Sequence, residues 1–294
     1  MICLQTLISP HPKGTNKNIL GVLALLISLF ITGCATPPPE PEVETASSEP
    51  AAEPVPPPAP PRLLFAGFAL HSQHKAFKND VLSAEAFAKS IDPNALVIKL
   101  ANSAKGEESD WPQATAENFQ FVMAKMAEVA RPEDKLLLLL SSRGRQGGLR
   151  INVANINHPP LTAASIAQAL EPIKSTPTLV VLSACYSGSL IKALEAPNRV
   201  ILTATDVRRT SLGCRYKLGN TYFGDALFNQ PNALEGSIEQ WMKQATAAIE
   251  GLEKKTRRTA SKPQIYVGEE VRDWATQPLN TWFATPNQDA KNPL

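Results

Sequence analysis

The sequence predicts an α/β fold in three layers, with a mostly parallel sheet of about six strands between helices. From Arg62 onward, short apolar runs alternate with segments of helical periodicity, which is the pattern of βαβ units. Residues 136–140 are all leucine, as expected for a strand that is covered on both faces. Between residues 119 and 130, apolar residues recur every three or four positions, which predicts a helix with one buried face.

The remaining elements follow from the same two patterns. The expected strands are the short apolar runs at residues 63–69, 95–100, 135–141, 178–183, 199–204 and 264–267. The expected helices lie between them, at residues 75–90, 115–130, 162–170, 222–229 and 237–255. The sequence contains no internal repeat and no dinucleotide-binding, P-loop or zinc-peptidase motif. We therefore expect no cofactor.

The first 33 residues have the features of a signal peptide. Residues 19–30 form an apolar run that follows Lys13 and Lys17 and is too short to span a bilayer comfortably. The run ends in the letters ITGC, which resemble the lipobox of bacterial lipoproteins and make Cys34 the expected lipidation site. In such proteins a residue other than Asp after the cysteine, here Ala35, usually accompanies sorting to the outer membrane. We expect a lipoprotein in the outer membrane that faces the periplasm. A short uncleaved anchor is the alternative.

Residues 34–61 are expected to hold the lipidated cysteine and a proline-rich linker. Of the 26 prolines in the chain, 11 lie between Pro37 and Pro61, together with five glutamates and little apolar surface. This composition is typical of an extended spacer, although a proline-rich ligand for aromatic grooves is an alternative. Residues 62–294 then form one domain.

The charge balance argues against a nucleic-acid partner. The chain has 29 Lys and Arg against 27 Asp and Glu, and after residue 33 the two counts are equal at 27. Nucleic-acid binders usually have an excess of basic residues. We therefore expect no nucleic acid.

The candidates for a site lie at the ends of the strands, because ligands of an open parallel sheet bind beyond the carboxyl ends of its strands. The first strand leads into His71 and His74, the third into Arg143 and Gly144, and the fourth into Cys185. A cysteine that enters a helix N-terminus meets the helix dipole and free N–H groups, which favour its thiolate. Unpaired cysteines are more often simply buried, so this position alone does not decide the question.

Three motifs carry a resemblance to a known family. The letters SACYSG at 183–188, TSLGC at 210–214 and YFG at 222–224 occur in this order. They resemble the bacterial lipoprotein branch of the legumain-like cysteine peptidases, in the clan that also holds the caspases, over residues 63 to about 268. The resemblance implies a caspase-like fold, a peptide or protein substrate, and Cys185 as the nucleophile. It also implies an oxyanion hole formed by the backbone N–H groups of Gly144 and Cys185.

The chain departs from this family at the general base. Where the family has Ser-Ser-His-Gly after the third strand, residues 141–144 read SSRG, so Arg143 replaces the histidine. A guanidinium stays protonated and has no lone pair to accept a proton. Its charge favours the thiolate of Cys185, but the leaving amine has no proton donor. Because loss of an acid–base partner removes about 10²- to 10⁴-fold in rate, we expect a sulfur that is reactive but weak or inactive on peptides.

The histidines leave an alternative open. The register of the resemblance places His74 near the entrance of the substrate pocket and His71 behind the missing base. His158 is expected on a loop or hairpin after the third strand. We expect pocket-lining or surface positions for all three, and a restored cysteine–histidine dyad is the alternative.

The expected pocket differs from that of the legumains. Ser183 takes the place of an acidic residue two positions before the cysteine, and Gln73 that of a pocket arginine, so asparagine specificity is not expected. Asp206, Arg208 and Arg209 follow the fifth strand at the same edge. They are candidates for contact with a charged substrate, and a solvated loop is the alternative.

The cysteines and the metal-binding residue types give two further expectations. In an oxidising periplasm a disulfide between Cys185 and Cys214 is an alternative that would block the nucleophile, although sequence does not give their separation. No cluster of residues has metal-ligand spacing, so no metal site is expected.

Three functions stay open at this point. The first is a membrane lipoprotein with a legumain-like peptidase domain that is weak or inactive. The second is an active cysteine endopeptidase that uses Cys185 with a relocated histidine. The third is a non-catalytic module that binds a peptide or an envelope protein.

Overall fold

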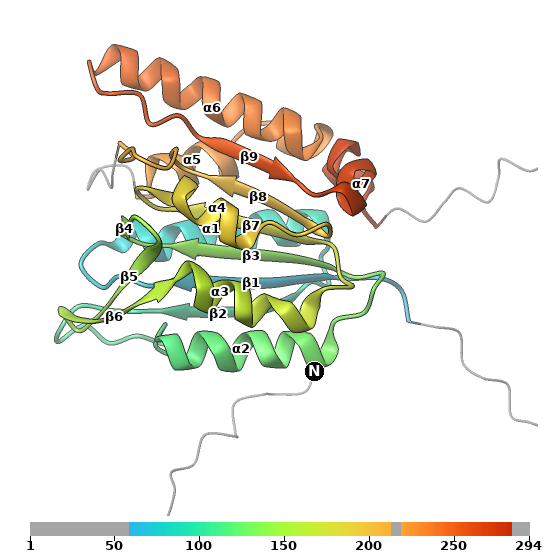
Figure 1. The fold of residues 1–294 in the computed structure, drawn as a ribbon, viewed down its shortest axis with the longest axis horizontal. Helices are drawn as coiled ribbons and strands as arrows, with labels where there is room; N and C mark the ends of the chain where they lie inside the picture. Colours follow the sequence, from blue (N-terminus) through green and yellow to red (C-terminus); the bar gives the residue numbers. More distant parts are fainter. Residues whose placement is uncertain (1–58, 213–218, 284–294) are drawn as a thin grey trace, which may run out of the picture. The chain divides into compact units, whose positions relative to one another are not determined.

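The computed structural model describes residues 59–212 and 219–283, and these form a central sheet between layers of helices (Figure 1). The six strands of the sheet lie in the order β2-β1-β3-β7-β8-β9. Their bounds are β1 (Leu63–Ala69), β2 (Leu96–Ala101), β3 (Lys135–Ser141), β7 (Thr178–Ser183), β8 (Arg199–Thr203) and β9 (Gln264–Val267). Neighbours are parallel except β9, which is antiparallel to β8. The predicted α/β fold and its six strands are confirmed.

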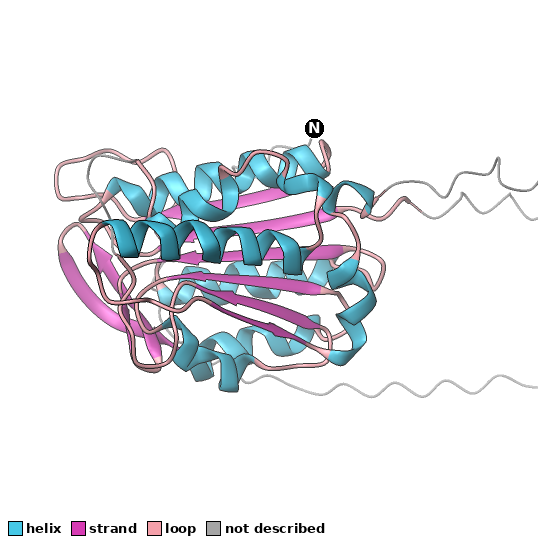
Figure 2. Ribbon diagram, turned by 90° about the horizontal axis from the view of Figure 1, so that it is seen from above, coloured by secondary structure: helices cyan, strands magenta, loops and turns pink. Residues whose placement is uncertain are grey.

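Helices cover both faces of this sheet, as Figure 2 shows. One core contains side chains of α1 (Lys75–Ile91), α5 (Tyr222–Phe228), α6 (Ile238–Lys255) and α7 (Arg272–Thr276). The core on the other face contains side chains of α2 (Ala116–Val129), α3 (Ala163–Leu170) and α4 (Ile191–Leu194). In β3, Leu137 and Leu139 belong to the first core, and Leu136, Leu138 and Leu140 belong to the second. The leucine run is therefore buried on both faces, as predicted.

Hydroxyl side chains fix where most of the longer helices begin. At the start of α2, α3, α5 and α6, the side chains of Thr115, Thr162, Thr221 and Ser237 each accept a hydrogen bond from a backbone N–H three residues ahead. At α6 the side chain of Gln240 completes a capping box. Three of the expected helices began on the capping residue itself, so the predicted and observed bounds differ by one residue there.

A second sheet follows β3, where the sequence indicated only a loop or hairpin around His158. Its strands pair in the order β4-β5-β6. Their bounds are β4 (Gly144–Arg145), β5 (Gly148–Val153) and β6 (Ile156–Thr162). The hairpin turn is formed by Ala154 and Asn155, which have φ of 49° and 67°, as in the tight turns that join antiparallel strands. The strand β6 was hard to predict because Pro159 and Pro160 have no N–H to donate.

Some expectations fall outside the described residues. The leader, Cys34 and nearly all of the linker lie before residue 59, and Cys214 lies in the segment 213–218. Within the described residues, no helix is both long enough and apolar enough to cross a bilayer.

Candidate active site

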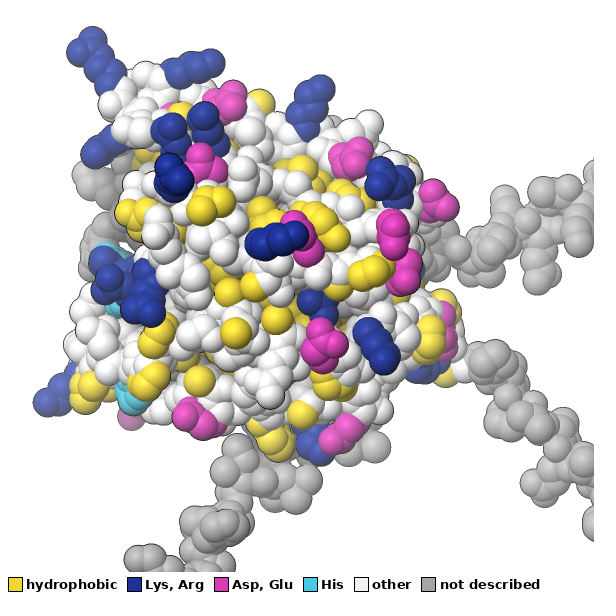
Figure 3. All heavy atoms as spheres, viewed as in Figure 1, with side chains coloured by type: hydrophobic (Ala, Val, Ile, Leu, Met, Phe, Trp, Pro, Cys, Tyr) yellow, Lys and Arg dark blue, Asp and Glu magenta, His cyan; other side chains and the backbone are white. Residues whose placement is uncertain are grey.

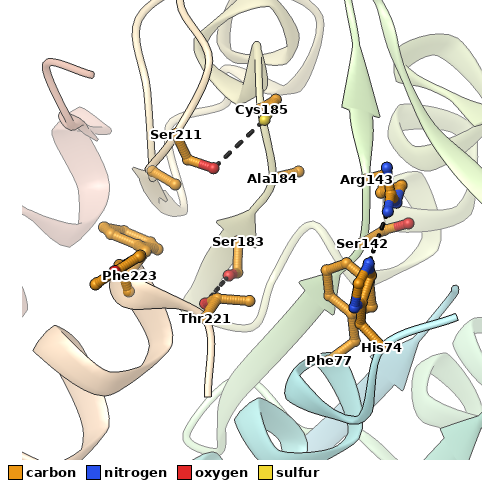
Figure 4. A pocket seen from close by; sticks show the side chains of 12 residues that line it. His74, Phe77, Ser142, Arg143, Ser183, Ala184, Cys185, Ser211, Thr221 and Phe223 are labelled. Atoms are coloured by element: carbon orange, nitrogen blue, oxygen red, sulfur yellow. Dashed lines mark hydrogen bonds between the residues drawn. The ribbon is translucent and has the colours of Figure 1, made fainter. Parts of the chain in front are cut away.

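A cavity of about 170 Å³ opens at the carboxyl ends of the central strands (Figure 4). Its walls come from the ends of β3, β7 and β8, from the start of α1 and from the first turn of α5. Four residues that the sequence singled out line it together, namely His74, Arg143, Ser183 and Cys185. The strand ends therefore meet at one site, as the parallel topology predicts.

Cys185 lies at a sharp turn between β7 and a short helical segment. The next residue, Tyr186, has φ 57° and ψ 18°, a left-handed conformation that is uncommon outside glycine. The Tyr186 N–H donates to the carbonyl oxygen of Arg209 at 2.8 Å. The Ser187 N–H donates to Oγ1 of Thr205 at 3.0 Å. These two bonds tie the turn to the segment after β8 and hold the cysteine in place.

The sulfur of Cys185 is hydrogen-bonded to a hydroxyl group. Its Sγ lies 3.4 Å from Oγ of Ser211. Figure 4 shows this pair on one side of the cavity and Arg143 on the other. Among the described residues, which include three of the four histidines, no imidazole is hydrogen-bonded to this sulfur. The described part of the chain thus has no hydrogen-bonded cysteine–histidine dyad.

Gly144 packs directly against the cysteine. A Cβ atom at this position would lie 1.8 Å from the carbonyl oxygen of Cys185 and 3.1 Å from Cβ of Ala184. No side chain fits in that space, because real Cβ atoms do not approach a backbone oxygen so closely. Gly144 and Cys185 are thus in contact, and the oxyanion hole expected from their N–H groups stays a prediction.

Arg143 reaches across the entrance of the cavity to His74. One of its Nη atoms lies 2.7 Å from Nε2 of His74. Since a guanidinium only donates, Nε2 must accept, and the imidazole is neutral with its proton on Nδ1. Burial and then the charge of Arg143 lower the pKa of His74. The Arg143 guanidinium therefore occupies the Nε2 lone pair of His74.

The other two histidines lie away from the sulfur. His71 is buried behind the cavity wall, where its Nδ1 accepts the N–H of Gln73 at 3.4 Å. Burial, followed by the positive charge of Arg143, lowers the pKa of His71 to about 4. His158 is exposed on β6. Neither lines the cavity.

A buried carboxylate that the sequence analysis missed supports the floor of the cavity. Asp80, on α1, is fully buried. It accepts hydrogen bonds from the hydroxyls of Ser141, Ser183 and Thr221 at 2.7, 3.0 and 2.7 Å. The backbone N–H of Thr221 at 2.9 Å and Nδ2 of Asn220 at 3.3 Å complete the set. Asp80 thereby joins α1 to the ends of β3 and β7 and to the start of α5.

Asp80 has no cationic partner among these contacts. Burial raises its pKa, and the hydrogen bonds from Ser141, Thr221 and Ser183 offset that rise only in part. A signal was present in the sequence, because Asp80 falls on the apolar face of α1 between Phe77, Val81 and Ala84. An acid at such a position needs polar partners, and here two of them are the cavity-lining residues Ser183 and Thr221.

Asp206 does not line the cavity. Its carboxylate pairs with Nε of Arg209 at 3.3 Å and accepts the N–H of Arg208 at 2.8 Å. Within the described residues, no group of three His, Cys, Asp or Glu side chains is arranged to hold a metal ion.

Comparisons with known proteins place the chain in a family. The model of the Peptidase C13 family matches residues 102–276. No curated protein matches the chain. Among solved structures, the crystal structure of caspase-1 from Spodoptera frugiperda aligns with 13% identity and a TM-score of 0.47, over 70% of this chain and 85% of that chain. Because the family model covers more than half of the sequence, and in agreement with the legumain-like motifs, the chain belongs to the Peptidase C13 family.

Proposed function

We propose that this chain is a membrane lipoprotein, anchored through Cys34 in the outer membrane, whose peptidase domain faces the periplasm. In this proposal Cys185 is the nucleophile, but the domain cleaves peptides weakly or not at all. The observation that carries the proposal is the pair formed by Arg143 and His74, with the Cys185 sulfur hydrogen-bonded to Ser211 instead of an imidazole.

Peptide cleavage needs a group that takes the thiol proton and later gives a proton to the leaving amine. Arg143 has no lone pair, and the Nε2 lone pair of His74 accepts from Arg143. Ser211 offers a hydroxyl, which is a poor base near neutral pH. Among the described residues, no proton carrier is thus available to the sulfur.

Alkylation of the sulfur, unlike amide cleavage, needs no proton donor for the leaving group. A haloacetamide loses a halide ion, which needs no proton, so thiolate attack alone completes the reaction. Arg143 lines the same cavity and supplies a positive charge there. The proposed protein thus keeps a thiol that reacts with alkylating agents while it lacks the acid–base step for amide bonds.

The test compares alkylation with cleavage in the same set of proteins. The purified protein, Cys185→Ala and Arg143→His are each treated with iodoacetamide and with a diverse peptide library. We expect labelling at Cys185 without cleavage in the native protein, and no labelling at that position in Cys185→Ala. Arg143→His should raise cleavage by about 10²-fold or more, because it restores an imidazole at the position of the base.

The matched control is Arg145→His, which places an imidazole on the same hairpin at an exposed position that does not line the cavity. It should produce no cleavage. Cleavage by the native protein as fast as that of Arg143→His, and absent in Cys185→Ala, would contradict the proposal and support an active endopeptidase.

The anchor is tested separately. Incorporation of radiolabelled palmitate in cells, and its loss in Cys34→Ser, would support lipidation of Cys34. Equal incorporation in both proteins, or none in either, would contradict it.

A further inference from the structure

The two chain segments that flank Cys185 both carry arginines. On one side, Gly144 packs against the Cys185 carbonyl, so Arg143 and Arg145 border the turn. On the other side, the carbonyl of Arg209 accepts the N–H of the residue after Cys185, and Arg208 immediately precedes it. Arginine-bearing segments therefore contact the Cys185 turn from two sides, and Arg143 also lines the cavity.

Arg143 and Arg145 share one face of the β4–β5 hairpin with a third arginine, Arg150. Gly144 pairs with Leu149, which places Arg143 opposite Arg150, and the N–H of Arg150 donates to the Arg143 carbonyl at 2.8 Å. Directly opposite residues of an antiparallel pair point to the same face, and so do residues two apart on one strand. Leu149 faces the core, so Arg143, Arg145 and Arg150 lie on the exposed face.

These cations are not balanced locally. We call Arg143, Arg145, Arg150 and Arg208 the arginine rim; all four are exposed. Among the described residues, no carboxylate forms an ion pair with any of them, whereas the neighbouring Arg209 is paired with Asp206. Like charges opposite one another on a hairpin destabilise it. A bound anion would reduce the repulsion between these arginines and so stabilise the hairpin.

The surface view agrees with this distribution. In Figure 3, Lys and Arg side chains gather along the left edge, which is the edge where the parallel strands of Figure 1 end. The acidic residues Glu107 and Glu108 belong to a different hollow, beside Lys75 and Lys78 of α1. Glu107 is already paired with Lys75 at 3.7 Å.

We infer that the arginine rim binds an acidic segment of a peptide, with carboxylate side chains on both sides of the Cys185 turn. The inference rests on the proposed function, which makes a peptide the ligand of this cavity. Guanidinium groups bind carboxylates through paired hydrogen bonds and retain their charge at any physiological pH. A flat anionic membrane would meet the exposed arginines but not enter the cavity that Arg143 lines, so a peptide fits the site better.

The test measures binding rather than cleavage, in the Cys185→Ala protein. The probes are two fluorescein-labelled peptides, one with four Glu-Ala-Gly repeats and one with four Lys-Ala-Gly repeats, followed by fluorescence anisotropy. We expect the glutamate peptide to bind and the lysine peptide not to bind. The dissociation constant of the glutamate peptide should rise at least tenfold between about 50 and 500 mM salt, because exposed ion pairs are screened over roughly 10 Å at 0.1 M and 3 Å at 1 M.

The variant combines Arg145→Glu, Arg150→Glu and Arg208→Glu, and leaves Arg143 in place. Each exposed ion pair contributes roughly 1.5- to 5-fold in affinity, so the triple reversal should weaken binding by roughly 3- to 100-fold. The matched control combines Lys174→Glu, Lys243→Glu and Arg272→Glu, three exposed cations without ion pairs in the described residues that do not line the cavity. It should bind the glutamate peptide as the parent does.

Each outcome decides the inference. Equal binding of both peptides, absence of binding, or binding that survives the triple reversal in a protein with an unchanged thermal midpoint would overturn it. Vesicles of phosphatidylglycerol and phosphatidylcholine form a second arm. If they bind through the same arginines and the glutamate peptide does not, the rim contacts anionic membranes instead. Since cleavage is not measured, failure of the proposed peptidase chemistry would leave these results unaffected.

Discussion

Two buried acids at opposite ends of the central sheet, Asp134 and Asp80, are held in different ways. At the amino end, Asp134 accepts from the backbone N–H of Arg62 at 3.0 Å and from the guanidinium of Arg131. At the carboxyl end, Asp80 has only neutral donors. Burial raises the pKa of both carboxyls, but the hydrogen bonds and the charge of Arg131 outweigh burial at Asp134 and lower its pKa.

The two acids therefore differ in whether a cation balances their charge: Asp134 has one and Asp80 has none among its hydrogen-bond partners. At the amino end, Asp134 is matched by the charges of Arg62 and Arg131. At the carboxyl end, an acid lies beneath the cavity without a cation, while the cations of the arginine rim lie above it without an acid. Natural proteins accept such unfavourable placements at functional sites and compensate for them elsewhere.

The largest expected effect comes from removing the acid beneath the cavity. Asp80→Ala leaves five buried hydrogen-bond donors without their acceptor, and should destabilise the fold by about 3 kcal/mol or more. For a domain of this size that corresponds to a fall of roughly 6–12 °C in the thermal midpoint, measured by circular dichroism. The control Asp110→Ala removes an exposed acid without an ion pair in the described residues and should shift the midpoint little. An equal effect of both variants would contradict the role of Asp80.

Gly144→Ala tests the contact with Cys185. The new methyl group would meet the Cys185 carbonyl, so the backbone must shift, at a cost of about 1–3 kcal/mol. Iodoacetamide labelling of Cys185 should also slow, because the turn that holds the sulfur moves. The control Gly251→Ala, on α6, adds a methyl group that meets nothing within 4 Å and should be neutral or stabilising. Unchanged stability and labelling in Gly144→Ala would argue against the close approach.

The two buried acids should give opposite pH dependences. The folded state holds the proton of Asp80 longer, so this contribution to stability is greatest below about pH 4 and is lost as the pH rises through the raised pKa. The contribution of Asp134 is present above about pH 4 and is lost as the pH falls through the lowered pKa. Urea unfolding of Asp80→Asn and Asp134→Asn between about pH 3 and pH 8 measures both. If the free energy of unfolding of the two variants depends on pH in the same way, the two acids do not differ as proposed.

The smallest expected effect is on the histidines near the rim. Arg143→Ala removes one of the charges that lower the pKa of His71 and His74. Both values should rise, and that of His71 should stay below 6.5 because burial is the larger cause. Imidazole proton shifts in an NMR titration measure this, with Arg145→Ala as the matched control. If the pKa of His71 does not move, Arg143 does not act on it.

The sequence predicts the fold well because its strands are separated by clear patterns. The leucine run predicts the strand β3, and the apolar periodicity predicts the helix α2. Because β3 and β7 are parallel, Gly144 and Cys185 then lie at the same edge of the sheet. Ser211 could not be predicted as a partner of the sulfur, because it lies in a loop without periodicity whose path depends on the Tyr186–Arg209 contact. Asp80 was missed for a related reason, since its partners come from three distant segments.

Thr221 links the cavity to a helix through a single oxygen atom. Its Oγ1 caps α5 by accepting the N–H of Gly224 at 2.9 Å, and the same hydroxyl donates to Asp80 and touches Ser183. A bound group that donates a hydrogen bond to Oγ1 of Thr221 would compete with the Gly224 N–H for this oxygen. The first turn of α5 then exchanges its amide hydrogens faster with deuterium. Occupancy of the cavity is thus reported by the backbone of a neighbouring helix, whether or not any bond is cut.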